Sequence, residues 1–343
     1  MRKIFFIRAN KTKYGGAENY LFRLSKALND RGIRHQIVNS RCPKFLPSWL
    51  RVVLFSILVC LKKSNRFYFS LERISCPDIY RAGDGVHKAF LAVERKSRLN
   101  PLHPVYLFLE KRCFNNAKRI IANSYMIKNE IVNIYDINPE KIDVVYNGVE
   151  SKKADYQGSF NRLSKEFNIR KNTPILLYVG SGFKRKGVEE FLEIISKLEV
   201  KNIRAFIIGK EKNLEHYKQL SKDLEIDKNV IFTGPRTDVD DFYVVSDFFI
   251  LPTHYEPFSN VVIEAMSLNN VVFTTSQNGA SEILDKEYVM ENSKDFSIVK
   301  KINELISNAQ QLEEVKYSNK LISKGFSIEH NLEQTLSVIE KSI

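Results

Sequence analysis

The chain has 343 residues, of which 43% are hydrophobic and 27% are charged, and its formal net charge is +13. This length accommodates two domains, and the composition excludes a disordered, collagen-like or low-complexity protein. The cysteines are scattered without a C-x-x-C pair, so they indicate neither a zinc site nor a disulfide framework, and we expect a reducing compartment. They are Cys42, Cys60, Cys76 and Cys113.

The excess positive charge lies in the first half of the chain. Residues 1–150 contain 27 lysines and arginines against 12 acidic residues, whereas residues 151–343 contain 26 against 28. Residues 81–120 are the densest part, with a net charge of +6. One basic half beside a neutral half predicts a face that meets a polyanion, such as nucleic acid, anionic lipid or a phosphorylated acceptor.

The chain opens with the pattern of a doubly wound domain. Residues 3–7 are a short, mostly apolar run before a charged residue. The run predicts a first strand, and it is too short for a signal peptide. A glycine turn follows at residues 14–19, then apolar residues at helical spacing over 21–29 and a second strand over 33–38.

The most apolar segment is residues 50–63, bracketed by Arg51 and Lys62. It is shorter than the roughly 20 residues that a membrane-spanning helix needs. Two interpretations remain: a buried helix of the first domain, or a helix lying in a membrane interface.

A second α/β pattern begins after a polar stretch. Residues 118–124 and 141–149 predict further strands, and residues 151–172 are polar enough to be a domain boundary. Strands and helices then alternate, which predicts a second parallel sheet. The expected strands are 174–180, 204–209, 230–234, 248–251 and 271–275, and the expected helices are 187–198, 215–224 and 239–245.

Residues 253–266 carry the most informative pattern. Glu256 follows a buried strand that stops at a proline, and Glu264 lies in the helix expected over 261–268. Ligands of open α/β sheets bind at the carboxyl ends of strands, and a helix start favours phosphate. Ser259 or Asn260 is expected to cap this helix. The arrangement suits a ligand with a central diphosphate and hydroxyl-bearing rings at both ends.

The sequence Glu-Pro-Phe-Ser-x4-Glu-Ala resembles the E-x7-E motif of the retaining glycosyltransferases of family 4. The resemblance implies the GT-B architecture, in which two Rossmann-like doubly wound α/β domains face each other across a cleft. The expected domains are an acceptor- and membrane-facing domain at 1–160 and a donor-binding domain at 161–326. The helix within 327–343 is expected to cross back to the first domain.

The resemblance implies a donor site in the second domain. Residues 179–187 resemble the diphosphate-binding turn, with Arg185 as a ligand and Lys186 beside it; Arg185 replaces the third glycine of G-x-G-x-x-G. Lys212 is implied as a second phosphate cation, and Lys210 remains a rival. The departures from the family pattern are Ser259 in place of glycine and the lack of an arginine directly after Gly180, so the dominant cation stays open. Further donor-binding residues are expected at Arg236, Pro257, Phe258, Ser259, Asn260, Val261 and Glu264.

The resemblance also implies that no metal is required. Asp238 and Asp240 resemble the D-x-D metal motif of other glycosyltransferases, but Asp238 is expected to be a helix N-cap.

In the first domain, Gly15 and Gly16 resemble the glycine loop that faces the donor phosphate and sugar. Residues 81–88 resemble the acceptor loop of lipopolysaccharide-core hexosyltransferases. Asp84 and His87 would then reach the transferred sugar or the acceptor hydroxyl, with Glu256 as the third residue assigned to the reacting centre.

The implied function is transfer of a hexose from a UDP-sugar to a phosphorylated lipid-linked glycan, with lipopolysaccharide core as the expected acceptor. The implied location is the cytoplasmic face of an anionic membrane.

The nearest alternative is a transferase for another cell-surface polysaccharide or glycolipid. A nucleic-acid-binding protein is not favoured, because no basic strands interleaved with aromatic residues and no reading helix are evident. A binding protein without catalysis would keep both domains and lose the donor cations.

Overall fold

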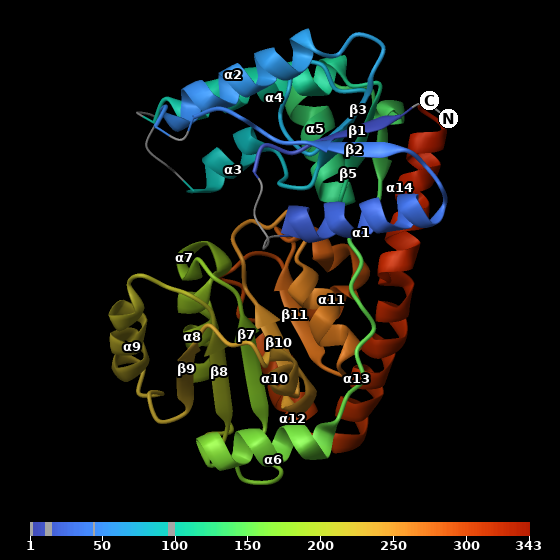
Figure 1. The fold of residues 1–343 in the computed structure, drawn as a ribbon. Coiled ribbons are helices and arrows are strands. Elements are labelled where there is room, and N and C mark those ends of the chain that lie inside the picture. Colours follow the sequence, from blue (N-terminus) through green and yellow to red (C-terminus); the bar gives the residue numbers. More distant parts are fainter. Residues whose placement is uncertain (1–2, 11–15, 44, 95–99) are drawn as a thin grey trace. The chain divides into compact units, whose positions relative to one another are not determined.

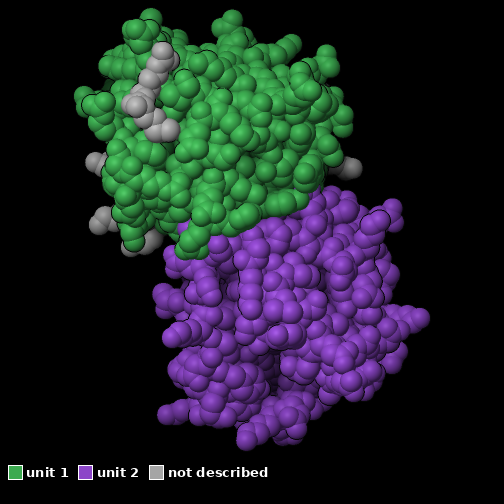
Figure 2. Space-filling view, turned by 90° about the vertical axis from the view of Figure 1, so that its right-hand side faces the viewer, with its two compact units in different colours: residues 1–146, 329–343 green, residues 147–328 purple. Residues whose placement is uncertain are grey.

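The computed structural model describes residues 3–10, 16–43, 45–94 and 100–343. The chain divides into two compact units, which are coloured separately in Figure 2. The first unit comprises Met1–Tyr146 and Glu329–Ile343, and the second comprises Asn147–Ile328. The sequence prediction set the division at residues 160 and 161, inside a helix that belongs to the second unit.

The first unit is built on a six-stranded parallel sheet of order β2-β1-β3-β4-β5-β6. Figure 1 labels its strands β1, β2, β3 and β5. Parallel neighbours need crossover connections. Helices supply them here except between β3 and β4, where residues 71–78 contain no helix. The strands are β1 (Ile4–Ile7), β2 (His35–Val38), β3 (Phe67–Ser70), β4 (Ile79–Ala82), β5 (Arg119–Ala122) and β6 (Ile142–Val144). The helices are α1 (Gly16–Asp30), α2 (Ser48–Leu61), α3 (His87–Glu94), α4 (Leu102–Asn116), α5 (Tyr125–Tyr135) and, from the end of the chain, α14 (Ile328–Glu340).

Alternate side chains of β1 enter two different cores of the first unit. Ile4 and Phe6 join a core with α1 and with Leu336 and Ile339 of α14. Ile7 lies in the other core, with Phe55 and Val59 of α2. The last helix is therefore a structural part of the first unit.

The second unit is a six-stranded parallel sheet of order β12-β11-β10-β7-β8-β9. Counted within the unit, this is the 3-2-1-4-5-6 order of the Rossmann fold. The strands are β7 (Ile175–Val179), β8 (Arg204–Ile208), β9 (Val230–Gly234), β10 (Phe248–Leu251), β11 (Val271–Thr275) and β12 (Val289–Met290). The helices are α6 (Tyr156–Phe167), α7 (Phe183–Lys186), α8 (Val188–Ser196), α9 (Leu214–Asp223), α10 (Val239–Val245), α11 (Asn260–Ser267), α12 (Ile298–Ser307) and α13 (Ala309–Ser323). The predicted α/β class with two doubly wound sheets is confirmed.

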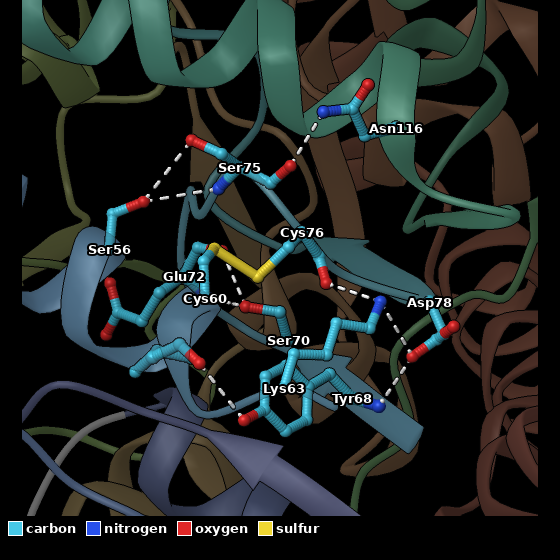
Figure 3. The surroundings of a disulfide bond; sticks show 11 residues. Ser56, Cys60, Lys63, Tyr68, Ser70, Glu72, Ser75, Cys76, Asp78 and Asn116 are labelled. Atoms are coloured by element: carbon cyan, nitrogen blue, oxygen red, sulfur yellow. Dashed lines mark hydrogen bonds and ion pairs between the residues drawn. A yellow bond between two sulfur atoms is a disulfide. The ribbon is translucent and has the colours of Figure 1, made fainter. Parts of the chain in front are cut away.

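A disulfide joins Cys60 near the end of α2 to Cys76 before β4, with 5.8 Å between the Cα atoms (Figure 3). The prediction that the cysteines form no disulfide was wrong. Spacing along the chain could not reveal the pair, because packing of α2 over the sheet brings Cys60 to the segment before β4. Cys42 and Cys113 remain free thiols.

Candidate functional site

The loops that follow β7 and β10 leave the same edge of the second sheet. These strands are neighbours in the sheet although β8 and β9 lie between them in the chain. The strand order reverses between them, and the crevice at such a switch point is the usual ligand site of open α/β sheets. The sequence-predicted Arg185 lies in the short helix α7 of the segment after β7, and Glu256 lies in the loop after β10.

The loop after β7 is held against the loop after β10 by backbone contacts. The carbonyl of Arg185 accepts hydrogen bonds from the His254 N–H at 2.9 Å and from Thr253 Oγ1 at 3.1 Å. Gly187 ends α7 with φ of 77°, and a Cβ there would lie 1.9 Å from the Pro252 carbonyl oxygen. Only glycine combines this conformation with such close backbone contact.

Glu256 forms ion pairs with Arg185 and Lys186, two of the three consecutive cations of α7. Its Oε2 lies 2.8 Å from Arg185 Nη1 and 3.4 Å from Lys186 Nζ. Arg185 Nη1 also donates to the Tyr255 carbonyl at 2.7 Å. Burial alone would raise the pKa of Glu256, but Lys186 and Arg185 outweigh it and hold the pKa below its ordinary value of 4.5. The site therefore contains an ionised carboxylate between two cations at neutral pH.

Glu211, which the sequence did not single out, organises the neighbouring turn. Its carboxylate accepts hydrogen bonds from the N–H groups of Phe183 at 3.1 Å, Lys212 at 2.7 Å and Asn213 at 3.0 Å. The Asn213 bond contributes most to holding the pKa of Glu211 below its ordinary value. Glu211 thereby ties the loop after β8 to the start of α7.

The two lysines beside Glu211 are both exposed. The backbone N–H of Lys210 donates to Ser181 Oγ at 3.1 Å. Within the described ranges, the ammonium group of Lys212 has no hydrogen bond or ion pair.

Ser259 occupies the N-cap position of α11, but its side chain makes no capping hydrogen bond. The backbone N–H of Ser259 donates to Asn278 Oδ1 at 3.2 Å, and Asn260 Oδ1 accepts from Asn147 Nδ2 at 2.8 Å. The expected side-chain cap was therefore wrong: the Ser259 hydroxyl makes no capping bond, and the Asn260 side-chain oxygen binds Asn147 instead. Pro257 and Phe258, which precede the helix, are buried, whereas Val261 is partly exposed.

Glu264 lies in α11, slightly more than one turn from its start. Tyr243 Oη donates to Glu264 Oε2 at 3.4 Å, and burial raises the pKa of Tyr243 well above its ordinary value, so the donor stays protonated. Glu264 is half-buried.

The guanidinium of Arg236 is held by two carboxylates. It pairs with Glu166 through 2.7 and 2.9 Å contacts and with Asp238 through 2.8 and 2.7 Å contacts. Asp238 precedes α10 at the N-cap position, but its side chain makes no capping bond, so this expectation also needs correction. Asp240 pairs with Lys152. In the part of the chain that the structure describes, no three His, Cys, Asp or Glu residues are placed to hold a metal ion.

His254 is a second residue that sequence reasoning missed. Its Nε2 lies 3.0 Å from Glu190 Oε1 in α8, and its Nδ1 lies 3.2 Å from Ser293 Oγ. The same residue binds the Arg185 carbonyl through its backbone, so it connects α8 to both site loops. A histidine two positions before Glu256 was the only available signal.

In the first unit, His87 begins α3 and is buried, whereas Asp84 is exposed. His87 Nε2 lies 3.1 Å from His103 Nδ1. The His87 N–H donates at 2.8 Å to Glu110, which is fully buried and also binds Arg73 and Tyr135. Neither the contacts of Glu110 nor the pairing of His87 with His103 was predicted.

Gly16 is the first residue of α1, and Gly15 lies outside the described residues.

Residues 159–323 match the family described as glycosyl transferases group 1, and residues 84–153 match glycosyltransferase family 4. The lipopolysaccharide glucosyltransferase WaaG of Escherichia coli is 26% identical over 59% of this chain and 56% of its own length. The matched part of this chain spans about half to three fifths of the curated relatives it resembles.

Two solved structures share the fold over nearly the whole chain. A crystal structure of WaaG superposes with a TM-score of 0.80 at 18% identity, covering 98% of this chain and 99% of that one. HepE of Anabaena, crystallised with UDP and glucose, gives 0.75 at 16% identity and covers 99% and 100%.

The two parallel sheets and these matches define a glycosyltransferase of the GT-B fold. A group 1 domain at residues 159–323 and a family 4 domain at residues 84–153 make up most of the chain, which is similar to the lipopolysaccharide glucosyltransferase WaaG.

No helix among the described residues is both long and apolar enough to cross a bilayer.

Proposed function

We propose that the protein transfers a hexose from a UDP-sugar to a lipid-linked glycan with retention of the anomeric configuration. The observation that carries the proposal is the pairing of Glu256 with Arg185 and Lys186 at the switch point of the second sheet. The complex of the similar HepE with UDP and glucose supports a UDP-sugar donor.

In this proposal the cations of the β7 and β8 loops stabilise the departing diphosphate. Arg185, Lys186 and one of Lys210 and Lys212 would neutralise the negative charge that develops as the sugar–phosphate bond breaks. The start of α11 would face the diphosphate, and the turn that leads into it consists of Pro257, Phe258, Ser259, Asn260 and Val261. The backbone beside Arg236 would contact the base. No metal is required, because side-chain cations and a helix start supply the positive charge.

Glu264 would bind the ribose hydroxyls and Glu256 the sugar hydroxyls. The bond between the anomeric carbon and the diphosphate oxygen breaks, and the acceptor oxygen bonds to the same face of that carbon. The acceptor proton passes to the leaving phosphate oxygen. In this route the acceptor oxygen itself attacks the anomeric carbon, so Glu256 is not assigned the nucleophile's role of the two-carboxylate scheme.

The acceptor would bind the first unit, with Asp84 and His87 reaching its hydroxyl or the transferred sugar, and with the Gly15–Gly16 segment facing the donor. The basic charge of this half suits a phosphorylated glycan on the cytoplasmic face of an anionic membrane. Lipopolysaccharide core is the acceptor we favour, because the similar WaaG is a lipopolysaccharide glucosyltransferase.

The proposal is tested by release of free UDP. A thermal-shift screen of nucleotide sugars first selects the donor, and UDP release is then measured with extracted glycolipid acceptors. Arg185→Ala and Lys212→Ala should each raise the activation free energy by about 2–4 kcal/mol, which lowers turnover roughly 30- to 1000-fold. The control Lys300→Ala changes an exposed lysine of α12 and should act like the wild type. Near-normal rates in both site variants would show that the donor site is misplaced.

Membrane attachment is tested separately with anionic vesicles. The protein should bind at low salt and dissociate at high salt, since each basic residue near the surface contributes about 1 kcal/mol. Charge reversal at Arg95, Lys96 and Arg98, which lie outside the described residues, should weaken vesicle binding without changing donor affinity. Equal binding to neutral vesicles would contradict the electrostatic part.

A further inference from the structure

A cavity of about 490 Å³ lies between α2 and the edge strand β2 of the first unit. The buried side chains of α2, Phe55 and Val59, pack in the core that contains Ile7 of β1 and Tyr68 of β3. Ile37 and Val38 of β2 line the cavity and remain partly open to solvent. This volume falls in the range of small-molecule sites, about 300–1,000 Å³.

The cavity is bordered by exposed apolar side chains of the same helix. Leu58 lines it and is 48% exposed, and Leu61, one turn later, is 78% exposed. Trp49 and Ile57 of α2 are also exposed. Ile57 and Leu58 lie four and three residues before Leu61, so these three exposed side chains adjoin on the helix surface. Such a patch indicates contact with a lipid or another apolar partner.

The surroundings of the cavity are positively charged. Residues 31–71 contain eight lysines and arginines and no aspartate or glutamate. Arg41, Lys62 and Arg66 line the cavity, and within the described ranges none of them pairs with a carboxylate. Lys63 instead pairs at 3.1 Å with Asp78, a carboxylate that it shares with Lys118. Three cations therefore line the cavity, within a wider basic region that also includes Arg31, Arg34 and Arg51.

Covalent and hydrogen-bonded links fix α2 beside the cavity (Figure 3). The disulfide holds Cys60 to Cys76, and Tyr68 Oη donates to the Val59 carbonyl at 3.1 Å. Ser56 Oγ accepts from the Ser75 N–H at 3.2 Å. A helix held in this way cannot easily move to close the space, so the cavity is preformed, which lowers the cost of binding.

We propose that this cavity binds an acyl chain of an anionic membrane lipid, with the lipid phosphate against Lys62 and Arg66. The lining is mixed: its apolar part, which includes Val38, Phe55 and Leu58, suits the chain, and its cations suit the headgroup. Gln36, Asn39 and Ser40 add uncharged polar groups to the wall. The site extends the membrane attachment proposed above, and it lies outside the sugar-transfer machinery. Its occupant is a bilayer lipid rather than free phosphate or a second copy of the chain.

The first test measures binding of dodecyl phosphate, below its micelle concentration, to the full-length protein by calorimetry. Dodecyl phosphate should bind at least tenfold more tightly than dodecyl maltoside, which has the chain without the charge, and than inorganic phosphate. Binding of inorganic phosphate with equal affinity would overturn the proposal in favour of a simple anion site. Binding of dodecyl maltoside with equal affinity would overturn the charged part of it.

Variants then locate the site. Leu58→Glu and the pair Lys62→Glu with Arg66→Glu should each weaken dodecyl phosphate binding at least tenfold. The matched control Lys300→Glu should change it less than twofold. Circular dichroism checks folding, and UDP affinity, which should be unchanged, separates failure of this site from failure of the donor site.

With vesicles, emission of Trp49, the single tryptophan, should shift to the blue on anionic membranes and shift less in Leu58→Glu. Wild-type behaviour of Leu58→Glu in both assays would overturn the proposal. So would lipid-independent dimerisation that Leu58→Glu abolishes.

Discussion

The ion pairs of Glu256 predict an unusual response to its neutralisation. In Glu256→Gln the side-chain shape is kept, but Arg185 and Lys186 lose their counter-charge. The three side chains are 17%, 27% and 15% exposed, so solvent screens the pairs only in part. At an effective dielectric constant of about 20 and a separation of about 6 Å from a bound diphosphate, one carboxylate charge opposes binding by about 3 kcal/mol. The variant should therefore bind UDP more tightly, by as much as roughly a hundredfold.

Turnover should fall in the same variant, because the proposed contact to the sugar hydroxyls is weakened and UDP leaves more slowly. Calorimetry with UDP at low and high salt measures the first effect, and salt should reduce the gain. Glu215→Gln removes an equal charge from an exposed position of α9 and serves as the control. Unchanged or weaker UDP binding in a folded Glu256→Gln variant would refute the assignment of Arg185 and Lys186 to the diphosphate.

The same carboxylate makes a pH prediction. Because the pKa of Glu256 is lowered in the folded protein, its contribution to stability is present above its ordinary pKa of 4.5 and is lost as pH falls through the lowered value. The wild type should exceed Glu256→Gln in thermal stability at pH 7, by about 1–2 kcal/mol. The two should converge in acid, and a constant difference down to pH 3 would contradict this reasoning.

Three further perturbations test other parts of the structure. Turnover should persist in excess chelator, and complete loss that Mg²⁺ or Mn²⁺ restores would instead indicate a metal site at Asp238 and Asp240. Gly187→Ala should destabilise the second unit by about 2–4 kcal/mol in thermal unfolding, since its Cβ would collide with the Pro252 carbonyl; an unchanged melting temperature would show that the loops relax freely. Cys60→Ser should cost about 2–4 kcal/mol without reductant and nothing with it, whereas Cys42→Ser should have no effect in either condition.

The second sheet was predictable because its strands are buried on both faces and form continuous apolar runs. The strand at Phe248–Leu251 and the helix at Val239–Val245 have the predicted bounds. In the first unit, β4 was missed because a buried arginine, Arg81, interrupts its apolar pattern. Helix α6 lay inside the expected linker, because only Phe160, Leu163 and Phe167 mark its apolar stripe.

The site could be predicted only as far as local sequence determines it. The glycine turn and the glutamate after β10 are local features, and both appear as loops at the carboxyl ends of strands. The partners of Arg236, Glu110 and His254 come from elements far away in the chain, so no local pattern identifies them. The same limit applies to the disulfide, whose two cysteines meet through tertiary packing.

Placement of α14 in the first unit has a consequence for biosynthesis. The core that contains β1 and α1 also needs Leu336, Val338 and Ile339, which the ribosome adds more than 300 residues later. Residues 147–328 are complete before that point, so the second unit has all of its sequence while the first still exposes the apolar groove that α14 fills. The first unit, although its strands are made first, therefore cannot complete its core before the whole sequence of the second unit has been made. A chaperone that binds exposed apolar surface would therefore bind the N-terminal part of the nascent chain.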